Sequence, residues 1–248
     1  VGSEMCIRDS AYPSLLYNAM VNPLVGLSMR GVIWYQGENN TNRAKEYYHL
    51  FPAMINDWRK KWGKDFPFYW VQLANYMDAV EVPSESLWAQ VREAQTQTLS
   101  LSHTGQAVII DIGEAKDIHP KNKQEVGRRL ALHALHNDYG FSDVVCESPM
   151  PKTVRRVQDK IAVQFDNVAD GLIVKNKYGY LMSFAVAGND GVYKWVQAKV
   201  AGKDRVVLSC PDVIDPVSVR YAWGDNPDDA NLYNSVGLPA TPFEIKIE

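Results

Sequence analysis

The feature that most constrains the fold of this chain is a change of pattern near residue 150. Before it, short apolar runs alternate with longer segments whose apolar residues recur at helical spacing. After it, the helical spacing disappears, and short alternating runs follow one another between turns such as Asn-Asp-Gly. The first pattern is typical of βαβ units with a parallel sheet, and the second of a small antiparallel β-domain.

The first part is expected to contain strands at 29–35, 66–74 and 106–112 and helices at 14–24, 43–62, 86–102 and 123–139. The helix at 43–62 would bury one face, formed by Tyr47, Leu50, Met54, Ile55 and Trp58. The second part is expected to contain strands at 160–165, 172–174, 180–186, 192–200 and 205–208. These patterns predict half of a doubly wound α/β domain, then a β-domain, with the boundary near 149–151.

The composition excludes several classes of function. A net charge of −3 provides no basic surface for nucleic acid or for an anionic membrane, and no apolar run is long enough to span a bilayer. The three cysteines show neither zinc spacing nor a disulfide framework, so we expect no metal site and no cofactor. Aromatic residues make up 11% of the chain, which suits packing of the β-domain and also contact with sugars.

A polar turn follows the first expected strand, and it consists of Gln36, Gly37, Glu38 and Asn39. The carboxyl ends of parallel strands meet at one edge of the sheet, where α/β proteins bind their ligands. The turn is therefore a candidate site. The alternative is an ordinary strand-to-helix turn in which Asn40 or Thr41 caps the next helix.

A second candidate group follows the third expected strand. It contains Asp111, Asp117 and His119, on a loop that Pro120 ends. A histidine beside a carboxylate is the arrangement of a general base with its orienting acid. The alternative is that Asp117 caps the coming helix and His119 is an exposed loop residue.

Other titratable residues carry weaker hypotheses. The remaining histidines are expected to be surface or core residues: His49, His103, His133 and His136. A glycosidase could use Glu38 and Glu114 as its acid and base. The expected open sheet does not favour that reading.

Six stretches of the chain resemble the sialate O-acetylesterase family, a carbohydrate-esterase branch of the SGNH hydrolases: 14–20, 31–40, 117–131, 219–227, 231–234 and 237–243. The resemblance implies a partial flavodoxin-like, three-layer SGNH domain over 11–148 and a β-rich accessory domain over 149–248. It also implies a Ser-His-Asp acetylesterase whose partner is an O-acetylated sugar, with sialic acid as the namesake. Family members are commonly exported, so the full-length protein is expected to be exported as well.

The resemblance assigns a role to each candidate residue. His119 would be the base and Asp117 its orienting acid, with Asp111 as the second choice because the superfamily usually spaces this pair one residue further apart. Gln36 would donate to the oxyanion, within a substrate-binding turn that includes Gly37 and Asn39. Glu38 would organise this turn by accepting backbone N–H bonds.

The nucleophile is the part of the family pattern that this sequence lacks. The family carries it in a Gly-Gln-Ser-Asn-Met type of block before the Gln-Gly-Glu block, and the only similar string is Gly26-Leu27-Ser28-Met29. Ser28 would lie at the wrong end of the first strand. The resemblance therefore predicts a carboxyl-terminal portion of an esterase that is inactive alone. The alternative is a non-catalytic module that binds carbohydrate or complements a partner.

Residues 1–10 have no periodicity and do not continue the resemblance. We expect them to be a non-native segment.

Overall fold

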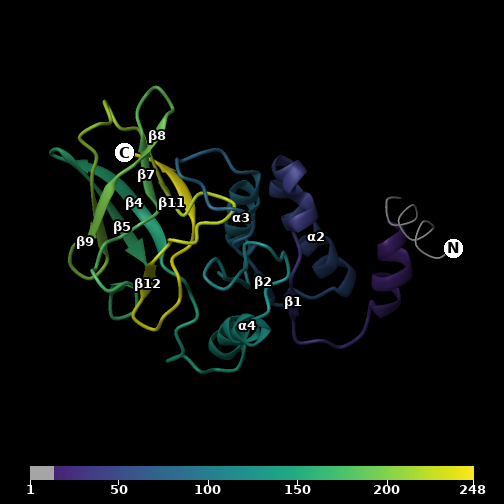
Figure 1. Cartoon of the computed structure of the whole chain (residues 1–248). Helices are drawn as coiled ribbons and strands as arrows, with labels where there is room; N and C mark the ends of the chain where they lie inside the picture. Colours follow the sequence, from purple (N-terminus) through teal and green to yellow (C-terminus); the bar gives the residue numbers. More distant parts are fainter. Residues whose placement is uncertain (1–13) are drawn as a thin grey trace.

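A computed structural model describes residues 14–248 and places a helix-rich part beside a β-rich part (Figure 1). The segment 1–10, expected to be non-native, and the start of the first expected domain lie outside the described residues.

The helix-rich part is built on a parallel sheet. Its strands are β1 (Val32–Trp34), β2 (Phe68–Val71) and β3 (Thr104–Ala107), in that spatial order. Three α-helices follow them in the chain: α2 (Ala44–Trp62), α3 (Leu87–Gln97) and α4 (Lys123–Asp138). The alternation of strands and helices confirms the α/β prediction for this part.

The two faces of this sheet are covered by different helices. Phe68 and Trp70 of β2 pack with α2 and α3 on one face. Tyr69 and Val71, the alternate residues of the same strand, pack with α4 on the other. The sheet is therefore the middle of three layers, and loops at its carboxyl edge are held from both sides.

Two helices differ from expectation. The helix expected over 14–24 is present but irregular: after Leu15 and Leu16 it continues as a π-helix, η1 (Tyr17–Val21), and a 3-10 helix, η2 (Asn22–Leu24), and neither of these buries a side chain. Pro23 lies at the start of the 3-10 helix, where its missing N–H interrupts an α-helical ladder. In α2, Tyr47 and Ile55 are buried as expected, but Leu50 is 53% exposed.

The strands of the parallel sheet are shorter than the apolar runs that predict them. The run at 106–112 contributes only its start to β3, because β2 ends at Val71 and offers no further partner. Val108 and Ile110, beyond the end of β3, belong instead to the core of the β-rich part. The two parts are thus joined by shared apolar packing.

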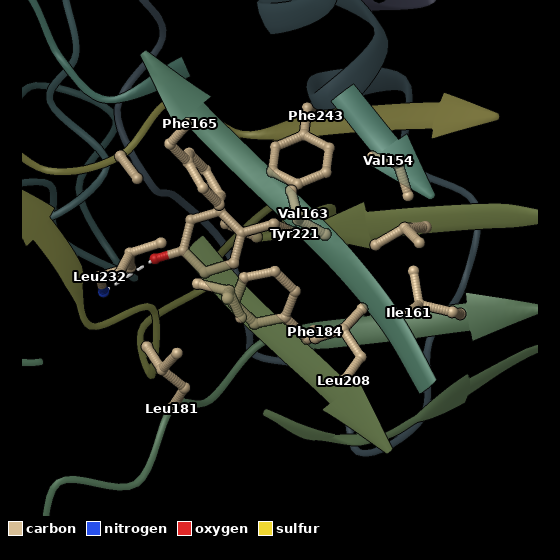
Figure 2. Close-up of a cluster of buried hydrophobic side chains, with 14 of the residues drawn as sticks. Val154, Ile161, Val163, Phe165, Leu181, Phe184, Leu208, Tyr221, Leu232 and Phe243 are labelled. Carbon is tan, nitrogen blue, oxygen red and sulfur yellow. Dashed lines mark hydrogen bonds between the residues drawn. The ribbon is translucent and has the colours of Figure 1, made fainter. Parts of the chain in front are cut away.

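The β-rich part consists of two four-stranded sheets and a two-stranded pair. One sheet contains β4 (Met150–Val157), β5 (Lys160–Asp166), β10 (Arg205–Ser209) and β9 (Gln197–Val200). The other contains β13 (Phe243–Lys246), β11 (Ser218–Tyr221), β7 (Phe184–Ala187) and β8 (Tyr193–Trp195), and the pair is β12 (Leu232–Asn234) with β6 (Leu172–Val174). Figure 2 shows the side chains of both large sheets meeting in one core, which includes Phe165, Phe184, Tyr221 and Phe243. The prediction of an antiparallel β-domain is confirmed.

The strand expected at 192–200 is wrong in one respect. It is two strands, β8 and β9, which belong to different sheets. The change of sheet occurs at Val196, whose N–H donates to the carbonyl of Phe184 at 3.0 Å. An alternating pattern predicts extended backbone but does not say which neighbour the backbone pairs with.

Candidate active site

The turn after β1 is held in its conformation by Gly37. This residue is buried and has φ +148°, in the region that L side chains rarely adopt. A Cβ atom there would lie 3.2 Å from the side chain of Leu73 and 3.3 Å from that of Gln95. Gln95 also donates to the carbonyl of Gln36 at 3.3 Å. The glycine lets the turn close down on the helix layer and fixes Gln36 at the sheet edge.

The side-chain amide of Gln36 is oriented by two neighbours. The hydroxyl of Tyr47 donates to Oε1 at 3.1 Å, and Nε2 donates to Oδ1 of Asn40 at 2.6 Å. A primary amide carries two N–H groups, so one of them is left for a further acceptor.

The loop after β3 is anchored to the loop after β2. The N–H of Gly113 donates to Oδ1 of Asn75 at 2.7 Å, and the N–H of Met77 donates to the carbonyl of Ala115 at 3.0 Å. A Cβ atom on Gly113 would lie 2.1 Å from the carbonyl oxygen of Asn75, so this close approach requires glycine. These bonds place the residues that follow, including His119, at the edge where Gln36 lies.

Asp117 and His119 lie together on this loop. The backbone N–H of His119 donates to Oδ1 of Asp117 at 2.9 Å, and the ring Nδ1 lies 3.6 Å from the same oxygen. The pKa of Asp117 is held below its ordinary value chiefly by that backbone hydrogen bond. The side chain of His119 is 84% exposed. Its Nε2 atom lies on the side of the ring away from Asp117 and is open to a further partner.

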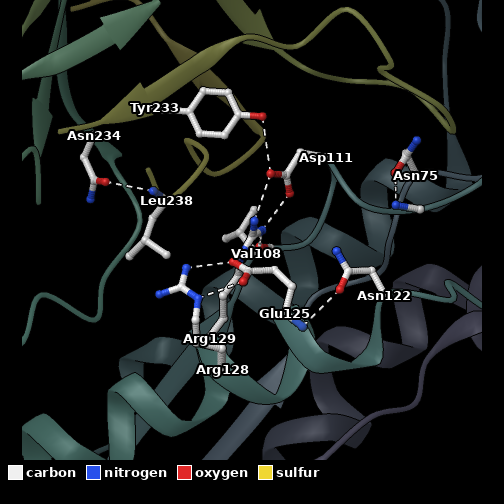
Figure 3. A network of polar contacts seen from close by, with 11 residues as sticks. Asn75, Val108, Asp111, Asn122, Glu125, Arg128, Arg129, Tyr233, Asn234 and Leu238 are labelled. Atoms are coloured by element: carbon white, nitrogen blue, oxygen red, sulfur yellow. Dashed lines mark hydrogen bonds and ion pairs between the residues drawn. The ribbon is translucent and has the colours of Figure 1, made fainter. Parts of the chain in front are cut away.

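Asp111 is committed to a different network, shown in Figure 3. Its carboxylate accepts two bonds from the buried Arg129, at 2.6 and 2.9 Å, and one from the hydroxyl of Tyr233 at 3.3 Å. Arg128 and Arg129 also bind Glu125, and this pairing lowers the pKa of Glu125 to about 2. Of the two acids considered from the sequence, only Asp117 lies beside the histidine.

The two candidate groups meet at one cavity of about 370 Å³. Its lining consists of Tyr35, Gln36, Glu38, Asn39, Ile118, His119 and Lys123. Within residues 14–248, no serine, threonine or cysteine lines it. The cavity therefore brings together an imidazole, a primary amide and a carboxylate, all from loops at the carboxyl edge of the sheet.

Glu38 does not have the contacts that the sequence reading expected. In the part of the chain that the structure describes, no hydrogen bond reaches its carboxylate, so the expectation that it accepts backbone N–H bonds is wrong. It lines the cavity instead. Burial, and then the charge of Glu38, raises the pKa of Tyr35 to about 12.

Three lining residues were not among the candidates from the sequence: Tyr35, Ile118 and Lys123. Lys123 lies with Nζ 4.6 Å from the centre of the Tyr35 ring. Lys123 is the first residue of α4, directly after its N-cap Asn122. Lys123 could have been predicted as a site residue, because it lies four residues after His119 and at the start of a helix. Nothing local distinguishes Tyr35 from the strand residues that precede it.

The other candidates lie elsewhere. The carboxylate of Glu114 pairs with Lys121 at 2.7 Å and does not line the cavity that Glu38 lines. The carbonyls on either side of Ser28 accept bonds from Trp62, the last residue of α2, and from Lys64 just after it. Gln36 instead contacts Tyr47, near the start of α2. Ser28 therefore lies at the opposite edge of the sheet.

His133 is buried in the core, and His49 and His103 are exposed, as the sequence reading expected. Among residues 14–248, no three His, Cys, Asp or Glu side chains are arranged to hold a metal ion. No helix in that range combines the length and apolarity that crossing a membrane requires.

Comparison with known proteins gives consistent results. Residues 4–136 match the family described as carbohydrate esterase, sialic acid-specific acetylesterase. Sialate O-acetylesterase of Rattus norvegicus is 30% identical over 97% of this chain and 48% of its own length, and that of Homo sapiens is 31% identical over 93% and 48%. The crystal structure of a carbohydrate acetylesterase from Xanthomonas citri is 44% identical and has a TM-score of 0.88, covering 94% of this chain and 54% of that one. The chain spans about half the length of the relatives it matches.

Proposed function

We infer the function of this chain from its family, because it belongs to the sialic acid-specific acetylesterase family of carbohydrate esterases. The proposed reaction is hydrolysis of an acetyl ester on a sugar hydroxyl. It would take place in a flavodoxin-like SGNH domain, and this chain would supply one half of the active site. His119 is the proposed base, Asp117 its orienting acid and Gln36 an oxyanion donor. Glu38 and Asn39 would contact the sugar.

The main support for this proposal is that Gln36 and His119 line the same cavity. With Nδ1 of His119 toward Asp117, Nε2 is the atom that would take the proton from a serine hydroxyl as its oxygen attacks the acetyl carbonyl. The free N–H of Gln36 would bind the oxyanion that forms. His119 then returns the proton to the departing sugar oxygen, and water releases acetate from the acetylated serine.

The serine is proposed to come from polypeptide that completes the sheet at β1. Within residues 14–248, β1 pairs only with β2 and its other edge is open. Ile33, in the middle of β1, is 71% exposed. It lies on the same face of the sheet as Tyr69 of β2, which α4 covers. A parallel strand added at this edge would end beside Gln36, and a helix following that strand would cover Ile33.

An assay of the isolated chain on 4-nitrophenyl acetate tests the missing nucleophile. We expect no hydrolysis above that of the His119→Ala variant. Hydrolysis that disappears in His119→Ala and persists in the matched control His49→Ala, another exposed histidine, would show that the chain carries its own nucleophile and would contradict the proposal.

A chimera tests the roles of the residues. The half of the Xanthomonas citri protein that this chain does not cover would be fused ahead of residue 14. We expect acetylesterase activity in the chimera, lost with His119→Ala and lowered about 10²–10³-fold in kcat with Gln36→Ala. An active chimera in which both variants keep full activity would remove these residues from the mechanism.

The exposure of His119 favours a second candidate function. A non-catalytic module would bind O-acetylated sugar in the same cavity without hydrolysing it. Equal binding by the chain and by an inactive chimera would support this candidate. The identity of the sugar and export of the full-length protein stay predictions.

A further inference from the structure

A second cavity lies where the β-rich part meets the loop between β2 and α3. It has a volume of about 320 Å³ and shares no lining residue with the cavity of Gln36 and His119. A larger cavity of about 690 Å³ adjoins it, and the two share Leu181, Met182, Trp195 and Val196. The two adjoining cavities are together called the Trp195 recess.

Trp195 presents an aromatic surface at the junction of the two cavities. The residue is 43% exposed, and its Nε1–H donates to the carbonyl of Glu81 at 2.9 Å. This bond ties the edge of the ring to the helix-rich part. A fixed indole with an open face is suited to pack against the C–H face of a sugar ring, because its apolar area is available at little cost in side-chain entropy.

The floor of the recess has backbone conformations that cost free energy. Ser183 has φ +61° and Ala222 has φ +50°, and both residues are buried. The N–H of Ala222 donates to the carbonyl of Ser183 at 3.0 Å, and the hydroxyl of Ser183 donates to Asp229. Non-glycine residues with such conformations cluster at ligand sites, where surrounding contacts enforce them. Here they fix the carboxylate of Asp229 in the wall.

Two polar groups of the recess lack partners. Trp223 is only 6% exposed, and its Nε1–H has no acceptor within residues 14–248. The carboxylate of Asp228, which also lines the recess, takes part in no hydrogen bond or ion pair in the described part of the chain. The exposed carboxylate of Asp228 is therefore free to accept from a bound hydroxyl.

We propose that the Trp195 recess binds a neutral sugar ring. Three carboxylates line its smaller cavity, those of Glu81, Asp228 and Asp229, with no lysine, arginine or histidine among the lining residues. Carboxylates accept bonds from sugar hydroxyls and repel an anionic sugar. The site is separate from the proposed ester site and would hold another unit of a glycan.

Saturation-transfer NMR with cellotetraose and xylotetraose tests this proposal. We expect transfer to the sugar protons of at least one of them, with affinity reduced at least tenfold in Trp195→Ala. Phe141→Ala is the matched control, because Phe141 is 56% exposed and lies outside both cavities. His119→Ala should also bind normally, which separates this site from the ester site.

Asp228→Asn is a second variant in case Trp195→Ala fails to fold. Asp228 is exposed, so its replacement should keep the thermal midpoint and weaken binding several-fold. Absence of binding by both tetrasaccharides, or binding that neither variant weakens, would overturn the proposal. Trp195-dependent binding of N-acetylneuraminic acid would overturn the assignment to a neutral sugar and would point to Lys160 and Lys199 of the larger cavity.

Discussion

Gly37 gives the turn after Gln36 a backbone conformation that other amino acids rarely adopt. We predict that Gly37→Ala lowers the free energy of unfolding by at least ~2 kcal/mol, because a methyl group would meet Leu73 and Gln95 at a strained φ. Gly63→Ala is the matched control. Gly63 also has positive φ but no atom within 4 Å of a built Cβ, so about 1 kcal/mol is expected there. Urea denaturation measures both, and equal losses would contradict the packing argument.

His133 is a buried histidine that stays neutral. Its Nε2 lies 3.1 Å from the carbonyl of Gln106 and must donate to it, while Nδ1 has no partner in residues 14–248. Burial lowers the pKa of His133 below its ordinary value. Below about pH 6.5, His133 therefore binds a proton more readily in the unfolded chain than in the folded chain. The free energy of unfolding should fall as the pH drops below this value.

Urea titrations between pH 8 and pH 5 check this sign. The wild-type chain should lose more stability across the range than His133→Gln does. The exposed His49 provides a control, and His49→Gln should keep the wild-type pH dependence. An identical pH dependence in His133→Gln and wild type would exclude His133 as the source.

At the scale of elements, α4 is locked to the sheet by Arg129. The guanidinium is buried and binds Asp111 and Glu125 together with the carbonyl of Val108 at 2.6 Å. We predict that Arg129→Met lowers the free energy of unfolding by ~3–5 kcal/mol, because it removes the cationic partner of the largely buried carboxylate of Asp111, which keeps only the hydroxyl of Tyr233. Arg128→Met, next to it on the same helix but 48% exposed, should cost no more than ~1 kcal/mol. A loss of stability in Arg129→Met as small as that in Arg128→Met would show that the Arg129 network does not stabilise the fold.

The helices and strands that can be predicted from the sequence are those whose ends are marked by nearby residues. Ser86 caps α3 by accepting from the N–H of Ala89 at 2.8 Å, and Gly140 follows α4 with φ +78°. The change of sheet at Val196 has no local signal, because it depends on strands far away in the chain. The short β3 is a similar case, since strand length is set by the neighbouring strand.

The candidate site was predictable in its outline. Gln36 and His119 each follow a parallel strand, and that topology alone brings them to one edge. The commitment of Asp111 to Arg129 and Tyr233 was not predictable, because it depends on side chains from α4 and the β-rich part. Local spacing could not show which aspartate lies beside the histidine.

At the scale of the whole molecule, Arg92 connects the helix-rich part to the β-rich part. It is fully buried on α3, and its guanidinium donates to the carbonyls of Leu73, Ala74, Gly224 and Asp225 at 2.6–2.9 Å. Burial lowers the pKa of Arg92 to about 9, which leaves the group charged at neutral pH. One side chain therefore satisfies backbone groups of both parts.

We predict that Arg92→Met lowers the free energy of unfolding by ~3–5 kcal/mol and separates the melting of the two parts, because carbonyls on each side lose their shared donor. Scanning calorimetry measures this: we expect two transitions in the variant and one in the wild-type chain. The matched control is Arg156→Met, an exposed arginine in β4 that should leave a single transition. A single transition in Arg92→Met, at the wild-type midpoint, would show that the other contacts between the two parts, including the apolar packing around Val108 and Ile110, are enough to couple them.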